Sequence, residues 1–118
     1  MTDRAYKLVD GDEWAGARAA GAYDGSAVDL ADGYIHMSTA AQLAETARRH
    51  YAGQTGLVLV EVALDRVGPA LKWEASRGGD LFPHLYAPLP LAAATRERSL
   101  TVDADGMMCF EDGTVGWP

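Results

Sequence analysis

The chain has 118 residues, 48% of them hydrophobic, and a formal net charge of −7. That length suits one domain, which would bury about two-thirds of its unfolded surface. The negative charge argues against nonspecific binding to nucleic acid or acidic membranes, because such binding depends on Lys and Arg side chains that neutralise phosphates. The single cysteine, Cys109, excludes an internal disulfide.

The first residues, Met-Thr-Asp-Arg-Ala-Tyr, lack the apolar stretch of a signal peptide. No apolar run in the chain approaches the length of a membrane-spanning helix. We therefore expect a cytoplasmic protein without a membrane segment, in which residues 1–118 form one domain.

In chain order, the first predicted elements are a strand and a short helix. Tyr6–Val9 is an apolar run that predicts a strand. Asp10 and Glu13 have the spacing of a capping box, which predicts the start of a helix ending near Gly21. Trp14 lies on the face of this helix that we expect to be buried against a sheet.

A second helix is predicted after a loop and a strand. Residues 23–31 have the composition of a loop, with Gly, Ser and Asp. Thr39 and Gln42 have the spacing of a second capping box, and the apolar periodicity that follows predicts a helix to about Tyr51.

The strand between them, Gly33–Thr39, carries a histidine. Alternation places Tyr34, His36 and Ser38 on one face and the apolar Ile35 and Met37 on the other. We expect the apolar face to pack on the core and the polar face to line a cleft.

The rest of the chain predicts strands. Leu57–Leu64 is a nearly continuous β-prone run that should lie centrally in a sheet. Leu71–Ser76 alternates, and Phe82–Tyr86 is expected at an edge or a bend because of its prolines. Residues 99–103 and 107–111 predict a hairpin with a type I′ turn at Asp105–Gly106. Two helices in the N-terminal half followed by strands indicate an α+β domain.

His36, Glu74 and His84 are the candidate catalytic residues. His36 could bind a ligand or transfer protons, since imidazole changes charge near neutral pH, or it could be a hydrogen-bonded core histidine. Glu74 follows Trp73, and an aromatic neighbour that desolvates a carboxylate raises its pKa; the alternative is a solvated strand glutamate. His84 shares a strand face with Tyr86 and could line the same cleft.

No metal site is expected. The three histidines and the lone Cys109 are too widely scattered to give the ligand spacing of a zinc site. Cys109 has no histidine or arginine close to it in the sequence, so we expect it to be unreactive.

Three blocks of the sequence resemble one family. Asp29–Thr39 with Gln42 closely resembles the signature of DUF 952, a family of unknown function. Leu71–Ser76 and Phe82–Tyr86 fit the same family in order and spacing. The resemblance covers roughly residues 5–96 and leaves a C-terminal hairpin and tail at 97–118.

The resemblance implies a fold and a ligand class. DUF 952 is grouped with ADP-ribosyltransferase-like proteins, which include the RNA 2′-phosphotransferases and have two small packed, mostly antiparallel sheets around a cleft for NAD or ADP-ribose. By that comparison His36 is a residue of the second motif. Lys7 stands near the first-motif position, where some relatives have histidine, and His84 stands on the strand that carries the late glutamate.

Two functions follow from these residues. The first is an enzyme that acts on NAD or on an ADP-ribosylated or phosphorylated nucleotide. In it, Glu74 would stabilise positive charge or activate the nucleophile, and His36 would hydrogen-bond the ribose or phosphate. The second is a non-catalytic module that binds a nucleotide or small metabolite in the same cleft. The residues expected to contact the ligand are Tyr34, Ser38, Lys7, Trp73 and Tyr86.

Overall fold

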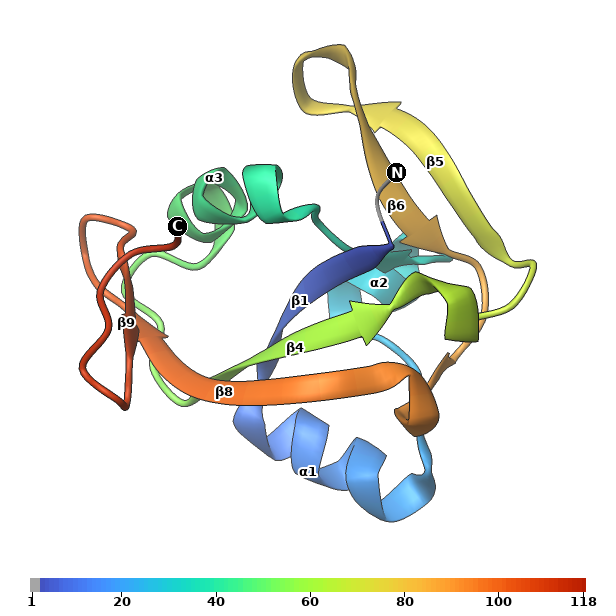
Figure 1. Ribbon diagram of the computed structural model, residues 1–118, viewed down its shortest axis with the longest axis horizontal. Helices are drawn as coiled ribbons and strands as arrows, with labels where there is room; N and C mark the ends of the chain where they lie inside the picture. Colours follow the sequence, from blue (N-terminus) through green and yellow to red (C-terminus); the bar gives the residue numbers. More distant parts are fainter. Residues whose placement is uncertain (1–2) are drawn as a thin grey trace.

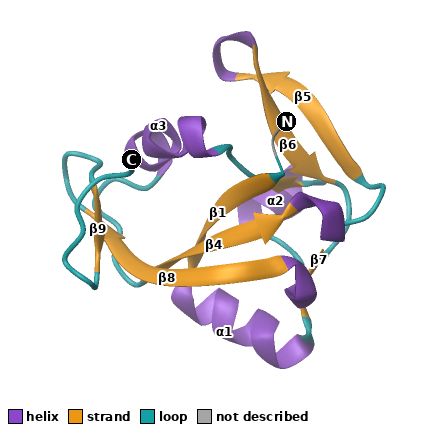
Figure 2. Cartoon of the chain, in the orientation of Figure 1, coloured by secondary structure: helices purple, strands orange, loops and turns teal. Residues whose placement is uncertain are grey.

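The computed structural model describes residues 3–118, apart from the side chain of Arg77. Within this range, three α-helices alternate with strands along the chain (Figures 1 and 2). The helices are α1 (Gly11–Ala20), α2 (Ala27–Asp32) and α3 (Ala40–His50). The strands are β1 (Arg4–Asp10), β2 (Ala22–Tyr23), β3 (Ile35–His36), β4 (Leu57–Ala63), β5 (Leu71–Ser76), β6 (Asp80–Leu85), β7 (Leu89–Pro90), β8 (Ala94–Val102) and β9 (Met108–Phe110).

The strands form antiparallel sheets, which confirms the α+β class. One sheet has the order β1-β4-β8-β9, a second has the order β3-β6-β5, and β2 pairs with β7. The prediction of a central strand at 57–64 is confirmed, because β4 lies between β1 and β8. The β5–β6 hairpin stands away from the four-stranded sheet (Figure 1).

The prediction of only two helices is wrong, because α2 occupies part of the expected loop at 23–31. Ser26 caps this helix, with its hydroxyl accepting from the Asp29 N–H while the Asp29 carboxylate accepts from the Ser26 N–H. Gly33 ends the helix in the left-handed conformation, with φ of 87°. Ser26 and Asp29 therefore form a capping box that the loop-like composition concealed.

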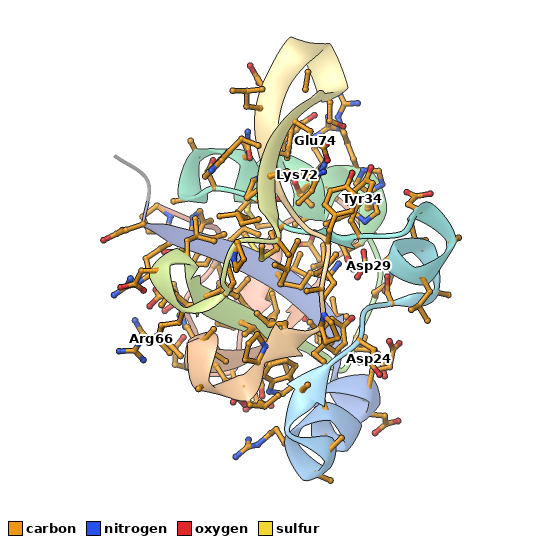
Figure 3. The ribbon with its side chains drawn as sticks, turned by 90° about the vertical axis from the view of Figure 1, so that its right-hand side faces the viewer. Asp24, Asp29, Tyr34, Arg66, Lys72 and Glu74 are labelled. Atoms are coloured by element: carbon orange, nitrogen blue, oxygen red, sulfur yellow. The ribbon has the colours of Figure 1, made fainter. Side chains whose placement is uncertain are left out.

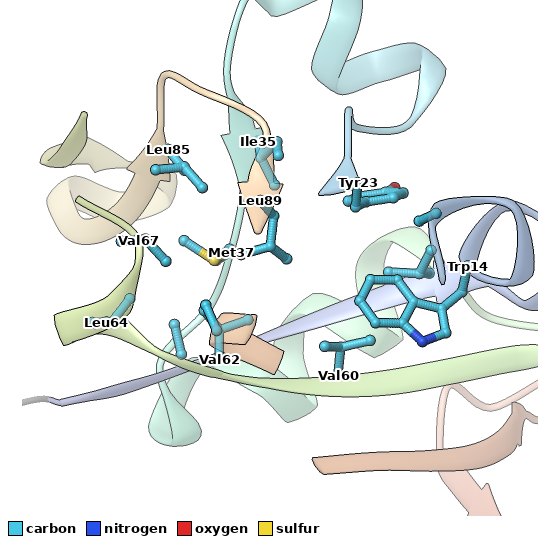
Figure 4. Close-up of a cluster of buried hydrophobic side chains, with 14 residues drawn as sticks. Trp14, Tyr23, Ile35, Met37, Val60, Val62, Leu64, Val67, Leu85 and Leu89 are labelled. Carbon is cyan, nitrogen blue, oxygen red and sulfur yellow. The ribbon is translucent and has the colours of Figure 1, made fainter. Parts of the chain in front are cut away.

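The four-stranded sheet separates two apolar clusters. Along β4, Val60 and Val62 face one cluster, whereas Leu57 and Leu59 face the other. The first cluster joins α1 to β3 and β6, and includes Trp14, Ile35, Met37 and Leu85 (Figure 4). The second lies under α3 and includes Leu43, Ala47 and Phe110. Burial of Ile35 and Met37 confirms the predicted apolar face of the histidine-bearing strand.

Two predicted details of the strands are wrong. Phe82–Tyr86 was expected at an edge or a bend, but β6 is the middle strand of its sheet, so the edge position is wrong. The N–H and C=O of one strand residue point to the same side, and the Pro83 carbonyl accepts from the Met37 N–H. The missing N–H of Pro83 therefore faces the chain just past the two-residue β3, where it interrupts no regular pairing. The β8–β9 turn is not type I′: Val102 pairs with Met108, and only Gly106 has a positive φ in the loop between them.

No helix of the part of the chain that the structure describes is both long and apolar enough to span a membrane.

Trp14 is 2% exposed, which confirms the predicted burial of the first helix. We expect Trp14→Ala to lower the free energy of unfolding by about 3–5 kcal/mol, because it leaves a cavity between α1 and the sheet. Urea unfolding measures the change. Trp73→Ala is the matched control, since Trp73 is 38% exposed and should give a clearly smaller loss. Equal losses in the two variants would contradict the packing described here.

Candidate functional site

Four of the predicted site residues gather on one face of the β3-β6-β5 sheet. His36 of β3 lies opposite His84 of β6 in the strand register, with ring centroids 5.6 Å apart. The ring of Tyr34 stacks on His84 at 4.2 Å and lies 5.0 Å from the ring of Tyr86. Figure 3 shows Glu74, Tyr34 and Asp29 one below another along this side of the molecule.

Glu74 holds two of these side chains in place. Its Oε1 lies 2.9 Å from Nδ1 of His84 and accepts a hydrogen bond of 2.7 Å from the Tyr86 hydroxyl. Because a carboxylate only accepts, the contact with His84 places a proton on Nδ1. Nζ of Lys72, also on β5, lies 4.7 Å from the centroid of the Tyr86 ring.

The expected rise in the pKa of Glu74 is wrong. Hydrogen bonds from Tyr86 and His84 hold the pKa of this exposed carboxylate below its usual range. The hydrogen bond that the Tyr86 hydroxyl donates to Glu74 raises the pKa of Tyr86 to about 12. Trp73 cannot desolvate Glu74, because successive side chains of β5 point to opposite faces of the sheet.

Asp29 connects His36 to the first strand and was not among the predicted site residues. Its carboxylate is 2% exposed, and Oδ1 lies 2.6 Å from Nδ1 of His36. Oδ1 also accepts from the backbone N–H of His36 at 3.1 Å, and Oδ2 accepts from Ser26 N–H at 2.9 Å. Nζ of Lys7 lies 3.1 Å from Oδ2. This buried carboxylate therefore ties β1, α2 and β3 together.

The charges of Lys7 and Asp29 compensate each other. Burial alone would raise the pKa of Asp29, but the hydrogen bond from His36, the charge of Lys7 and the backbone N–H groups outweigh it and hold this pKa below its usual range. Burial lowers the pKa of Lys7, and Asp29 offsets part of that shift. Lys7 is buried because its side chain lies on the same face of β1 as Ala5 and Val9, toward the first apolar cluster.

His36 has a carboxylate at each ring nitrogen. Nδ1 faces Asp29, and Nε2 lies 2.9 Å from Oδ2 of Asp32, the last residue of α2. The His36 side chain is 34% exposed. An imidazole donates to two carboxylates at once only when both nitrogens carry protons.

An open groove of about 730 Å³ lies beside the two histidines; Glu74 and Tyr86 are not among its lining residues. Its lining comes mainly from β1, α2, the segment around β3, and α3 with the segment after it. Among the side chains that line it are Lys7, Asp29, Asp32, Tyr34, His36, Ser38, Arg49 and His84. The described chain thus brings imidazole, aromatic and charged side chains to one concave surface.

Three predicted contact residues have other surroundings than expected. Ser38 is 3% exposed, and its hydroxyl lies 2.8 Å from that of Thr46, which joins the strand to α3. Lys7 is engaged by Asp29. Trp73 lies on the sheet face opposite Glu74, and it is not among the groove-lining residues. A ligand-contact role for these three residues stays a prediction.

No group of three or more His, Cys, Asp or Glu side chains within the described residues has an arrangement that could hold a metal ion.

The sequence held a signal for Asp29. Ser26 and Asp29 have the spacing of a helix capping box, which predicts that the Asp29 side chain turns back toward the start of α2. The partner Lys7 is 22 residues away, and only the pairing of β1 with the rest of the fold brings it close.

The fold and the groove define an α+β protein with two carboxylate-bound histidines on adjacent strands. The chain belongs to the DUF952 family, described as "Protein of unknown function", whose pattern matches residues 8–97. It is similar to protein CC0527 from Caulobacter crescentus. The X-ray structure of that protein is 51% identical, with a TM-score of 0.84, covering 89% of this chain and 92% of that one.

The solution NMR structure of CC0527 is similar as well, with 53% identity and a TM-score of 0.76 over 90% of each chain. A crystal structure of a double mutant of CC0527 has 50% identity and a TM-score of 0.84, over 89% of this chain and 92% of that one. No curated protein matches this chain.

Removing Asp29 should destabilise the fold strongly. We expect Asp29→Ala to lower the free energy of unfolding by about 3–5 kcal/mol, because the buried ammonium of Lys7 would lose its counter-charge. Chemical denaturation at pH 7 measures this. Asp24→Asn, which removes a charge from an exposed residue nearby, is the control and should change stability little. A loss in Asp29→Ala no larger than that of the control would contradict the ion pair.

The stabilisation by Asp29 should depend on pH. Its pKa in the folded chain is lowered, so its contribution is present above the ordinary aspartate pKa of about 4 and is lost as the pH falls below that value. The difference in unfolding free energy between the unmodified chain and Asp29→Asn should therefore narrow from pH 6 to pH 3. A difference that stays constant over this range would contradict the prediction.

Proposed function

We propose that this protein binds a nucleotide in the groove beside His36 and acts on its phosphate or ribose. The ligand class is NAD or an ADP-ribosylated or phosphorylated nucleotide. In this proposal the protein has an ADP-ribosyltransferase-like fold, and His36 is the group that gives or takes a proton at the ligand.

The observation that carries the proposal is the orientation of His36. Asp29, buried and paired with Lys7, engages Nδ1, so Nε2, whose partner is the exposed Asp32, is the ring nitrogen that a ligand can reach. A carboxylate that holds one nitrogen of a histidine fixes the orientation of the ring, which suits a general acid or base. His36 is the more accessible of the two histidines, at 34% side-chain exposure against 6% for His84.

The neighbouring rings support a nucleotide rather than another anion. Tyr34 and Tyr86 lie beside His36 and His84, and nucleobases stack on such aromatic faces for about 1–3 kcal/mol per base. Lys72, close to the Tyr86 ring, adds a positive charge near the same surface. Glu74 supports this surface by holding His84 and Tyr86, a positioning role in place of the direct catalytic role first expected.

A non-catalytic binding module is the second candidate. It is favoured by the commitment of Glu74, His84 and Lys7 to partners within the protein. Such a module would use the same aromatic and imidazole surface to hold a nucleotide without turnover.

The test combines binding and turnover. A thermal-shift panel of AMP, ADP-ribose, NAD and adenosine reports binding, and chromatography with 31P NMR follows nicotinamide release and changes at phosphorus. We expect His36→Asn, whose amide can still donate to Asp29, to keep the fold and reduce turnover by about 100-fold or more. Glu74→Gln tests the role of Glu74. Glu111→Gln, the same change at an exposed residue in the turn after β9, is its control.

The outcomes separate the two candidates. Stabilisation by nucleotides with turnover that falls in His36→Asn supports the enzyme. Full activity in Glu74→Gln would contradict any role for Glu74. Stabilisation without turnover supports the binding module, and neither effect with any nucleotide would contradict both.

A further inference from the structure

The two carboxylates that contact His36 differ in burial and in the number of their partners. Asp29 is 2% exposed and is held by Lys7 and by backbone N–H groups in addition to the ring. Asp32 is 47% exposed, and its contact with Nε2 of His36 is the one side-chain ion pair found for it among the described residues.

The position of Asp32 allows it to leave the ring. It is the last residue of α2, and Gly33 follows in the left-handed conformation that ends the helix. Rotation of one exposed side chain would uncover Nε2 without breaking a helix hydrogen bond. The same rotation at Asp29 would bury an unpaired ammonium on Lys7, which is far more costly.

We propose that Asp32 occupies the place of a ligand phosphate, and that a nucleoside monophosphate displaces it from Nε2 of His36. This rests on the proposed function and names the atom and the contact that change on binding. The exchange is non-covalent: the Nε2 proton is donated to a phosphate oxygen in place of Oδ2 of Asp32, and no bond to phosphorus forms or breaks.

The surroundings of Nε2 match this ligand. The charge of Asp29 is balanced by Lys7, so Asp32 is the carboxylate whose departure leaves His36 with an unshared positive charge when both nitrogens are protonated. Arg49 of α3, which is paired with Glu45, lines the same groove. The Tyr34 ring lies 4.5 Å from the His36 ring, stacks on His84 and is partly exposed, so it places an aromatic group next to the phosphate position.

Isothermal titration calorimetry with AMP and with adenosine tests the proposal on the unmodified protein, Asp32→Asn and Asp24→Asn. Asp24→Asn removes the same charge from an exposed position outside the groove lining. We expect Asp32→Asn to bind AMP about tenfold more tightly than the unmodified protein, because a repelling charge next to the phosphate is gone. Adenosine affinity should stay unchanged, and Asp24→Asn should behave as the unmodified protein.

AMP affinity in Asp32→Asn no higher than in Asp24→Asn would overturn the inference while leaving nucleotide binding intact. An equal gain for adenosine would also overturn it, because Asp32 would then obstruct the groove by its size and not by its charge. Absence of AMP binding to all three proteins would overturn both this inference and the proposed phosphate ligand.

Discussion

The buried carboxylate of Asp29 meets an ammonium from β1, a backbone N–H at the start of α2 and an imidazole from β3. A charge removed from water is tolerated only when such partners are all in place. These three elements therefore have to assemble around it together. The position of His36 in the groove follows from this requirement, because both its ring and its backbone N–H donate to the same oxygen.

Glu74 gives the second histidine a similar arrangement with less burial. It joins His84 to Tyr86, and Tyr34 then stacks on the His84 ring. The two histidines are direct neighbours across β3 and β6. The result is a row of rings along one sheet face, held by one buried and one exposed carboxylate. The opposite face of the same strands carries Ile35 and Leu85 into the core, so the site is supported by apolar packing beneath it.

Local patterns in the sequence predicted much of this arrangement. Alternation alone assigned His36 to the polar face and Ile35 to the core, since side-chain direction in a strand depends only on parity. The spacing of Thr39 and Gln42 gave the start of α3, where Oε1 of Gln42 accepts from the Thr39 N–H. The sequence allowed Glu74 and His84 to line one cleft, and the pairing of β5 with β6 in the structure brings them into contact.

The sequence could not reveal contacts that depend on the tertiary fold. Lys7 was expected to contact a ligand because it stands near the first-motif position in the family resemblance. Its counter-charge, Asp29, lies on α2, whose residues were expected to form a loop. Pro83 suggested an edge strand, because the shortness of β3, which makes the missing N–H harmless, is not visible in the sequence. The sequence around Glu74 did not show which neighbours set the pKa of its carboxylate. The register of β5 and β6 places Glu74 beside His84 and Tyr86, which lower that pKa.

Asp29 fixes the ring of His36 through Nδ1. Long-range 1H–15N NMR correlation of the histidine side chains, in the unmodified protein near neutral pH, tests it without any ligand. We expect a protonated Nδ1 for His36, with a proton shift moved downfield by a short hydrogen bond to the carboxylate. An unprotonated Nδ1, in a neutral ring protonated only at Nε2, would contradict it.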